Sequence, residues 1–144
     1  MPYAGDSREY GDSDDGGHAM TVRELVNGNV IWIGPDATLH QAAVLMMSNE
    51  VGSVAVEVDG AMEGILTERD ILKAVAEDAD PDQDRVRTWM TGYPDSFTPD
   101  MNVEEAAEWM LATGFRHLPV IDGDEVLGVI SIKDVLWAIT DSKV

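Results

Sequence analysis

Cysteine is absent from this 144-residue chain, and no apolar run approaches the roughly 18 residues that a membrane-spanning helix needs. The absence of cysteine excludes a disulfide framework, a thiolate metal site and a thiol nucleophile. The three histidines are scattered without the spacing of metal ligands, which argues against zinc (His18, His40 and His117). No secretory signal peptide is recognisable. We therefore expect a cytoplasmic protein that does not insert into a membrane.

Basic residues are also few, since nine Lys and Arg face 28 Asp and Glu and the formal net charge is −19. Such a surface repels nucleic acid phosphates, so we expect no nucleic acid partner. It also repels itself, which destabilises the compact state unless salt screens the charges. At about 1 M salt the Debye length is roughly 3 Å, short enough to suppress most of that repulsion. The composition therefore predicts a halophilic protein from a salt-accumulating cytoplasm, with an acidic mesophilic protein as the alternative.

The sequence also lacks the common catalytic motifs, because it contains no P-loop, no G-x-S-x-G elbow and no H-E-x-x-H pair. Paired acids are plentiful, but a chain this acidic contains such pairs by chance. We therefore expect a protein that is not an enzyme, with no catalytic residue, no metal site and no required cofactor.

What the chain does contain is an internal repeat. The stretches GILTERDILKAVA (64–76) and GVISIKDVLWAIT (128–140) share the pattern G-x-x-[ST]-x-x-D. A shift of 64 residues aligns Val22–Glu77 with Val86–Asp141 without a gap. The period exceeds that of a solenoid repeat, so two copies rather than an array are expected.

The repeat predicts a division of the chain into three parts. Residues 1–20 are rich in Gly, Asp and Ser and have no hydrophobic periodicity, so we expect a flexible acidic tail there. The first repeat is expected at 21–80 and the second at 81–144.

Each copy first predicts a short strand, at residues 30–33 or 96–98, and then a helix. Thr38 and Asn102 each precede apolar residues at helical spacing, and a Gln or a Glu follows three residues later, as in a capping box or a close variant of one. Gly114 is placed to end the second of these helices in the left-handed conformation.

A hairpin and a closing helix follow in each copy. Turns are predicted at residues 59–60 and 122–123 between branched apolar runs, and the closing helices begin at Thr67 and Ser131. A single unit of strand, helix, strand, strand and helix is too small to bury its faces well. We therefore expect an α/β (α+β) fold of two tandem β-α-β-β-α repeats packed as a pseudo-twofold pair.

This arrangement resembles the cystathionine-β-synthase-type (CBS) domain, which occurs in tandem pairs. The resemblance rests on the two closing signatures, on VRTWMTG (86–92) and on GFRHLPVID (114–122). In the family, the cleft between the copies binds adenosine-containing ligands such as AMP, ADP, ATP or S-adenosylmethionine. The resemblance implies a stand-alone regulatory module that binds such a ligand, forms a homodimer and acts on a regulated protein that the sequence does not identify.

The resemblance also implies binding residues in the two closing signatures. Asp70 and Asp134 are placed to accept hydrogen bonds from both hydroxyls of a ribose, as the acidic residue of dinucleotide folds does. The hydroxyl and the helix N-terminus beside each aspartate suit a phosphate, and a basic residue before each aspartate adds charge (Thr67, Ser131, Arg69 and Lys133). The alternative is structural, because T-x-x-D is itself a capping pattern.

Arg116 and His117 lie where family members often place cations that contact phosphate, and Arg bonds phosphate bidentately. The matching positions of the first copy are Gly52 and Ser53, so we expect two unequal sites, with the one around Asp134 the better phosphate binder. The alternative is an exposed Arg beside a His that packs on a strand.

For the adenine ring, the family's apolar contacts fall by position on Ile33 and Phe97. The alternative is that these are plain core residues. Two other functions stay open: a ligand-free module that dimerises and scaffolds a partner, and an acidic module that senses Mg²⁺ through acids gathered at an interface.

Overall fold

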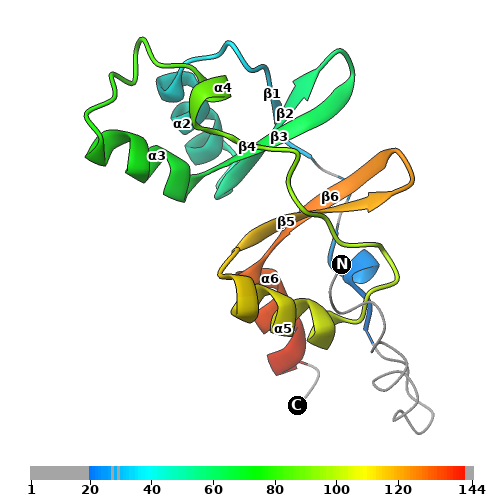
Figure 1. Cartoon of the computed structure of the whole chain (residues 1–144). Helices are drawn as coiled ribbons and strands as arrows, with labels where there is room; N and C mark the ends of the chain where they lie inside the picture. Colours follow the sequence, from blue (N-terminus) through cyan, green and yellow to red (C-terminus); the bar gives the residue numbers. More distant parts are fainter. Residues whose placement is uncertain (1–19, 27, 29, 142–144) are drawn as a thin grey trace, which may run out of the picture. The chain divides into compact units, whose positions relative to one another are not determined.

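The computed structural model describes residues 20–26, 28 and 30–141 (Figure 1). Apart from Met20, the predicted acidic tail lies outside the described residues, as does His18. The chain divides into two compact units, which are unit 1 (Met1–Asn29 and Asp95–Val144) and unit 2 (Val30–Pro94). In the described part of the chain, no helix is both long and apolar enough to cross a membrane.

Unit 2 is built on a four-stranded sheet in the order β1-β2-β3-β4. The strands are β1 (Trp32–Ile33), β2 (Ser53–Val58), β3 (Ala61–Thr67) and β4 (Thr91–Gly92). The first pair is parallel, and the other two are antiparallel. The helices are α2 (Leu39–Ser48), α3 (Glu68–Ala76) and α4 (Val86–Trp89). Branched residues of β2 and β3 form its core with one face of α2, one residue of α3 and one of α4 (Leu39, Ala42, Met46, Val54, Val56, Leu66, Ala74 and Val86).

Unit 1 repeats this design with a smaller sheet. Its elements are the 3-10 helix η2 (Val22–Leu25), α5 (Val103–Thr113), β5 (His117–Asp122), β6 (Glu125–Ser131) and α6 (Ile132–Asp141). The expected strand at 96–98 is a single parallel bridge between Phe97 and Val120. The core is larger than that of unit 2 and contains two aromatic rings (Phe97 and Trp109, with Val22, Met110, Leu118 and Ile130 among its other members).

The predicted local signals are present. Thr38 accepts a hydrogen bond from the Gln41 amide at 3.1 Å, and Gln41 Oε1 accepts one from the Thr38 amide at 2.9 Å, which completes a capping box. Gly114 ends α5 with a φ of 83°, as predicted. The first hairpin turns at Asp59 and Gly60, both at positive φ.

Two details of the second repeat differ from the prediction. The hairpin pairs Asp122 with Glu125, so its turn is at Gly123–Asp124 rather than one residue earlier. Asn102 caps the Glu104 amide at 2.7 Å, and Glu105 lies 1% exposed in the core of unit 1 instead of standing on the surface as Gln41 does.

The two units exchange the leading segments of the repeats, which are residues 20–26 and 84–90. In unit 2, the amides of Val86 and Arg87 donate to the carbonyls of Ala37 and Pro35, both at 2.9 Å. In unit 1, the equivalent hydrogen bonds run from Val22 to Met101 and from Arg23 to Pro99, at 2.9 and 3.1 Å. Each compact unit therefore combines the body of one repeat with the leading segment of the other.

The repeated glycine of the closing signature is explained by this exchange. A Cβ on Gly64 would lie 2.6 Å from Met90 Sδ and 2.9 Å from the Thr91 carbonyl. A Cβ on Gly128 would lie 2.9 Å from the Cβ of Val26, which is the residue equivalent to Met90. Only glycine allows the leading segment to approach the strand this closely.

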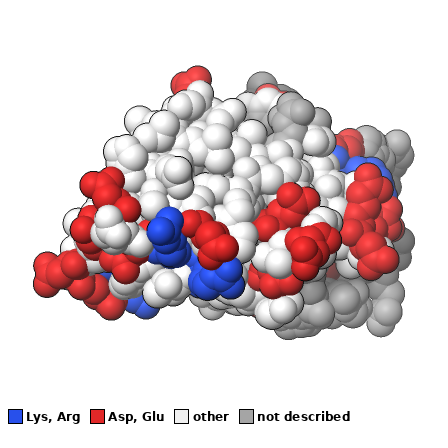
Figure 2. All heavy atoms as spheres, turned by 90° about the horizontal axis from the view of Figure 1, so that it is seen from above, with Lys and Arg blue, Asp and Glu red and all other residues white. Residues whose placement is uncertain are grey.

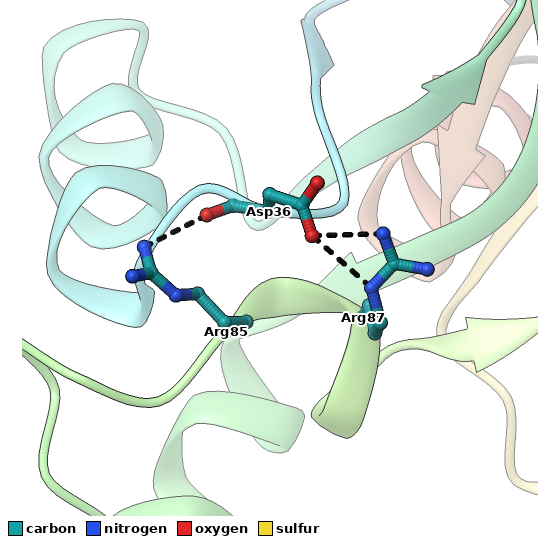
Figure 3. Close-up of polar contacts among 3 residues, drawn as sticks. All are labelled: Asp36, Arg85 and Arg87. Carbon is teal, nitrogen blue, oxygen red and sulfur yellow. Dashed lines mark hydrogen bonds and ion pairs between the residues drawn. The ribbon is translucent and has the colours of Figure 1, made fainter.

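Arginines hold the leading segment of unit 2 more firmly than that of unit 1. Arg87 donates from Nε and Nη2 to Asp36 Oδ1 at 3.2 and 2.8 Å, and Arg85 Nη1 donates to the Asp36 carbonyl at 2.9 Å (Figure 3). In unit 1 the matching arginine, Arg23, forms a longer ion pair of 3.6 Å with Asp122.

Candidate ligand-binding sites

The start of α6 brings together the hydroxyl and the carboxylate of the second signature. The Ser131 amide donates to Asp134 Oδ2 at 2.9 Å, and the Asp134 amide donates to Ser131 Oγ at 3.2 Å. Both residues are half-buried. The pair is thus a reciprocal helix cap, as the structural alternative predicted, and it occupies one oxygen of the carboxylate. Within the described residues, Asp134 Oδ1 has no hydrogen bond.

Three cationic or titratable side chains border this cap. The Ile132 amide donates to the Arg116 carbonyl at 2.8 Å, and His117 stands opposite Ser131 in the β5–β6 pairing. Arg116 and Lys133 are exposed and form no ion pair with any residue that the structure describes, whereas His117 is half-buried. The second copy therefore places five of the predicted ligand residues at the start of one helix.

The first copy has the same cap in unit 2. Asp70 Oδ2 accepts from the Thr67 amide at 2.8 Å and from Thr67 Oγ1 at 3.1 Å, and the Asp70 amide donates to Thr67 Oγ1 at 3.3 Å. Gly52 and Ser53 occupy the places of Arg116 and His117, because the Glu68 amide donates to the Gly52 carbonyl at 2.9 Å and Ser53 pairs with Thr67. The exposed Arg69 is then the basic residue nearest in sequence to this cap.

The two predicted adenine contacts are placed differently. Ile33 lies in β1, is half-buried and packs against the core of unit 2. Phe97 is fully buried in unit 1, where its ring meets Trp109 edge-on at a centroid distance of 5.7 Å and 83° between planes. The Phe97 ring is therefore part of the core, which was the alternative to an adenine contact. A flat base has no access to that ring in this conformation.

Sequence reasoning missed the aromatic stack behind Phe97. Trp109 also stacks on Phe115, with ring centroids 5.9 Å apart. The indole Nε1 of Trp109 is buried without a hydrogen-bond partner among the described residues. In the sequence, Trp109 directly precedes the apolar Met110 of α5, but nothing in the pattern indicates that Phe115, beyond the Gly114 turn, covers it.

The chain that carries the candidate sites is strongly acidic, with a formal net charge of −19. On the face that Figure 2 shows, most of the charged side chains are Asp or Glu. In the described ranges, no group of three or more His, Cys, Asp or Glu side chains is arranged to hold a metal ion. Because an anionic ligand meets long-range repulsion from this surface, the few cations beside each cap weigh more than they would on a neutral protein.

Comparison with known proteins gives consistent matches. The family model described as "CBS domain" matches residues 22–77 and 86–141. A 17.7 kDa protein of Acidianus ambivalens is 36% identical over 125 residues, which is 85% of this chain and 75% of the relative. The crystal structure of a CBS-domain containing protein from Agrobacterium tumefaciens has a TM-score of 0.81 at 33% identity and covers 88% of this chain and 98% of that chain.

A further crystal structure, of a CBS domain pair in complex with 5′-methylthioadenosine and S-adenosyl-L-methionine, has a TM-score of 0.76 at 20% identity. It covers 86% of this chain and 98% of that chain. At this identity the likeness shows the fold alone.

Proposed function

This chain belongs to the CBS-domain family, with the fold of a CBS domain pair, and we propose that it is a regulatory module that binds an adenosine-containing ligand at the start of α6. The observation that carries the proposal is the geometry of the Asp134 cap. Its Oδ2 is bonded to the Ser131 amide, while its Oδ1 is not hydrogen-bonded within the described chain and the residue is half-buried. The cap therefore fixes a carboxylate that still has an oxygen for a ribose hydroxyl.

Capping and ribose binding are compatible in this arrangement. The hydrogen bond to the Ser131 amide orients the Asp134 carboxylate before a ligand arrives, so binding costs little further side-chain entropy. A ribose diol donates two hydrogen bonds, and a charged acceptor makes such bonds stronger than a neutral one does. The same reasoning applies to Asp70, whose Oδ2 is held by Thr67.

We propose that the two sites differ in their preference for phosphate. The exposed side chains of Arg116 and Lys133 border the Asp134 cap, and Arg bonds phosphate bidentately. The Asp70 cap has Gly52 and Ser53 in place of Arg116 and His117. AMP, ADP and ATP are therefore expected to favour the site of unit 1. S-adenosylmethionine, which has no phosphate, gains less from these cations.

A panel of thermal shifts in molar KCl tests this function. Wild type is measured with AMP, ADP, ATP, S-adenosylmethionine and Mg²⁺, beside Asp134→Ala and beside Thr38→Ala as a control that loses only a helix cap. Each variant should lose about 1 kcal/mol of stability as a capping mutant. Only Asp134→Ala should also lose most of the shift that AMP, ADP or ATP induces, because the weaker site at Asp70 remains. If no adenosyl compound shifts wild type, the ligand-free scaffold becomes the better account, and a shift with Mg²⁺ alone favours the cation sensor.

Two further properties belong to the proposal. We expect a homodimer, because several large apolar side chains of the helices are exposed (Val44, Met47, Leu72, Val75, Leu111, Leu136 and Trp137). We also expect a halophilic protein whose melting temperature rises steeply with KCl, since about 1 M salt shortens the Debye length to roughly 3 Å. A melting temperature that does not change with KCl would contradict the halophilic origin.

A further inference from the structure

Three aromatic rings of unit 1 are packed together at the end of α5. The Phe97 and Trp109 rings meet edge-on, and the Phe115 ring lies nearly parallel to the indole of Trp109, with 18° between the planes and 5.9 Å between the centroids. Phe97 is fully buried and Trp109 is 3% exposed, whereas Phe115 is 46% exposed. The indole therefore lies between a ring of the core and a ring that is partly in solvent.

The indole of Trp109 also contains a donor without an acceptor. Its Nε1 is buried and has no hydrogen-bond partner in the part of the chain that the structure describes. Buried donors are nearly always hydrogen-bonded, and an unpaired one costs free energy. The arrangement in which Phe115 covers Trp109 is thus less stable than its apolar packing alone would make it. An arrangement that lets water or a ligand reach the indole N–H recovers part of that cost.

The backbone around Phe115 allows its ring to move. Gly114 ends α5 in the left-handed conformation, and the Phe115 amide donates to the Thr113 hydroxyl at 3.4 Å, which is long for a hydrogen bond. The next residue, Arg116, is held more firmly, because its carbonyl accepts from the Ile132 amide at 2.8 Å. The Phe115 side chain can therefore turn away from the indole while the start of β5 keeps its place.

This aromatic stack lies at the same end of unit 1 as the Asp134 cap. Phe115 stands between the end of α5 and the start of β5. At that start His117 pairs with Ser131, and α6 begins at the residue after Ser131. A flat ring placed on Trp109 and a ribose placed on Asp134 therefore approach unit 1 from the same end.

The first repeat has no such stack. Leu45 and Val51 occupy the positions of Trp109 and Phe115 in the 64-residue register. Leu45 is half-buried and Val51 is 38% exposed, so the places are similar and the aromatic rings are missing. A flat ring gains stacking energy on an indole that an aliphatic side chain does not supply. The stack is thus specific to the unit whose cap has Arg116 beside it.

We propose that Phe115 is a displaceable cover and that the Trp109 face beneath it is the subsite for the purine base of the ligand. The proposal rests on the adenosine-binding function proposed above and names the group that holds the base. A purine has a larger π-face than a phenyl ring, so the exchange of Phe115 for the base increases the stacking on Trp109. Without ligand, Phe115 keeps this face of the indole out of water.

Two ligands and three variants test the subsite by calorimetric titration in molar KCl. AMP and ribose 5-phosphate share the sugar and the phosphate, and only AMP has the base. Phe115→Ala uncovers Trp109, and Val51→Ala is the matched control in unit 2. Trp109→Leu introduces the residue that unit 2 has at the same position. Thermal unfolding checks that each variant is folded, and Phe115→Ala decides the proposal if Trp109→Leu does not fold.

We expect Phe115→Ala to tighten AMP binding by about two- to tenfold, because the base no longer competes with the phenyl ring. Trp109→Leu should weaken AMP binding by about tenfold, since the stacking surface is lost. Ribose 5-phosphate should bind within about twofold of wild type in both variants. Val51→Ala should leave both ligands within about twofold as well.

Three results overturn the subsite and leave the proposed function standing. In the first, AMP binds wild type, and Phe115→Ala leaves its affinity unchanged or weakens it. In the second, Val51→Ala tightens AMP binding as much as Phe115→Ala does. In the third, ribose 5-phosphate responds to the substitutions as AMP does, or a folded Trp109→Leu binds AMP as wild type does. An absence of AMP binding to both wild type and Phe115→Ala instead overturns the adenosine site on which the proposal rests.

Discussion

Unit 1 and unit 2 share one backbone design and differ in the side chains that surround it. Both have a reciprocal hydroxyl–aspartate cap at the closing helix, and both have a glycine where a leading segment crosses the hairpin. Unit 1 places Arg116 and His117 beside its cap, whereas unit 2 has Gly52 and Ser53 there. Duplication has thus preserved the features that the backbone needs, while the groups available to a ligand or a partner have diverged.

The helices show the same separation of roles. Helices α2 and α5 keep an apolar inner side, but their outer sides are neutral in unit 2 and acidic in unit 1. We infer that unit 1 is the better suited of the two to an anionic ligand. The predictions below test which features are common to both units and which are specific to one.

The largest expected effect concerns the common glycine. Gly64→Ala should destabilise the protein by about 1–3 kcal/mol, because its Cβ would overlap Met90 Sδ and the Thr91 carbonyl. Gly128→Ala should have a similar cost through Val26. Urea unfolding at fixed KCl measures both. Gly34→Ala is the control, since a Cβ there meets nothing within 4 Å. A control as costly as the two variants would show that the close approach is not the cause.

A smaller effect is expected where the units differ in backbone strain. Glu50 has a φ of 53° at the end of α2, and the equivalent residue of unit 1 is Gly114 at 83°. Left-handed backbone costs a residue with a Cβ about 1 kcal/mol. Glu50→Gly should therefore stabilise unit 2 by up to about 1 kcal/mol, and Gly114→Glu should destabilise unit 1 by a comparable amount.

Urea unfolding also separates strain from charge at this position. Glu50→Gln removes the charge and keeps the strained backbone, so it should recover little of the gain. If Glu50→Gln stabilises as much as Glu50→Gly does, charge repulsion rather than conformation accounts for the difference between the units.

The smallest effect concerns the arginine pair of unit 2. Arg87 and Asp36 are mostly exposed, and exposed ion pairs contribute about 0–1 kcal/mol. Arg87→Ala should therefore cost less than about 1 kcal/mol at low salt and less still in molar KCl. Arg23→Ala, at the longer pair with Asp122, should cost even less. Urea unfolding at two KCl concentrations measures the loss of stability in each variant. A larger loss for Arg23→Ala than for Arg87→Ala would contradict the view that arginines hold the leading segment of unit 2 more firmly.

Local signals predicted much of this structure. The caps at Thr38, Thr67 and Ser131 and the left-handed Gly114 depend on residues three or four positions apart, which a single sequence displays. The exchange of leading segments was not predicted, because the hydrogen bond between Val86 and Ala37 joins residues that share no local pattern. The shared Val-Arg pair at 22–23 and 86–87 was the available signal.

The candidate sites were also predicted only in part, because some of their contacts join residues that are far apart in the sequence. The sequence motifs indicated both His117 and Ser131 as candidate residues, and the pairing of β5 with β6 places them opposite each other. The sequence left open whether Phe97 is an adenine contact or a core residue, because a residue in a short strand has two faces and the covering Trp109 comes from a separate helix. Glu105 was expected to take part in a capping box or a close variant of one, but Asn102 caps the helix through the Glu104 amide and Glu105 lies in the core.

The most direct test of the central claim is calorimetric titration of ATP into wild type, Asp134→Ala and Asp70→Ala in molar KCl. The specialisation of unit 1 predicts that Asp134→Ala removes the tighter binding event and that Asp70→Ala leaves it intact. Arg116→Ala should weaken that same event by about tenfold, as loss of a charged hydrogen bond would. Equal losses in the two aspartate variants, or tight binding that survives Asp134→Ala, would contradict the account.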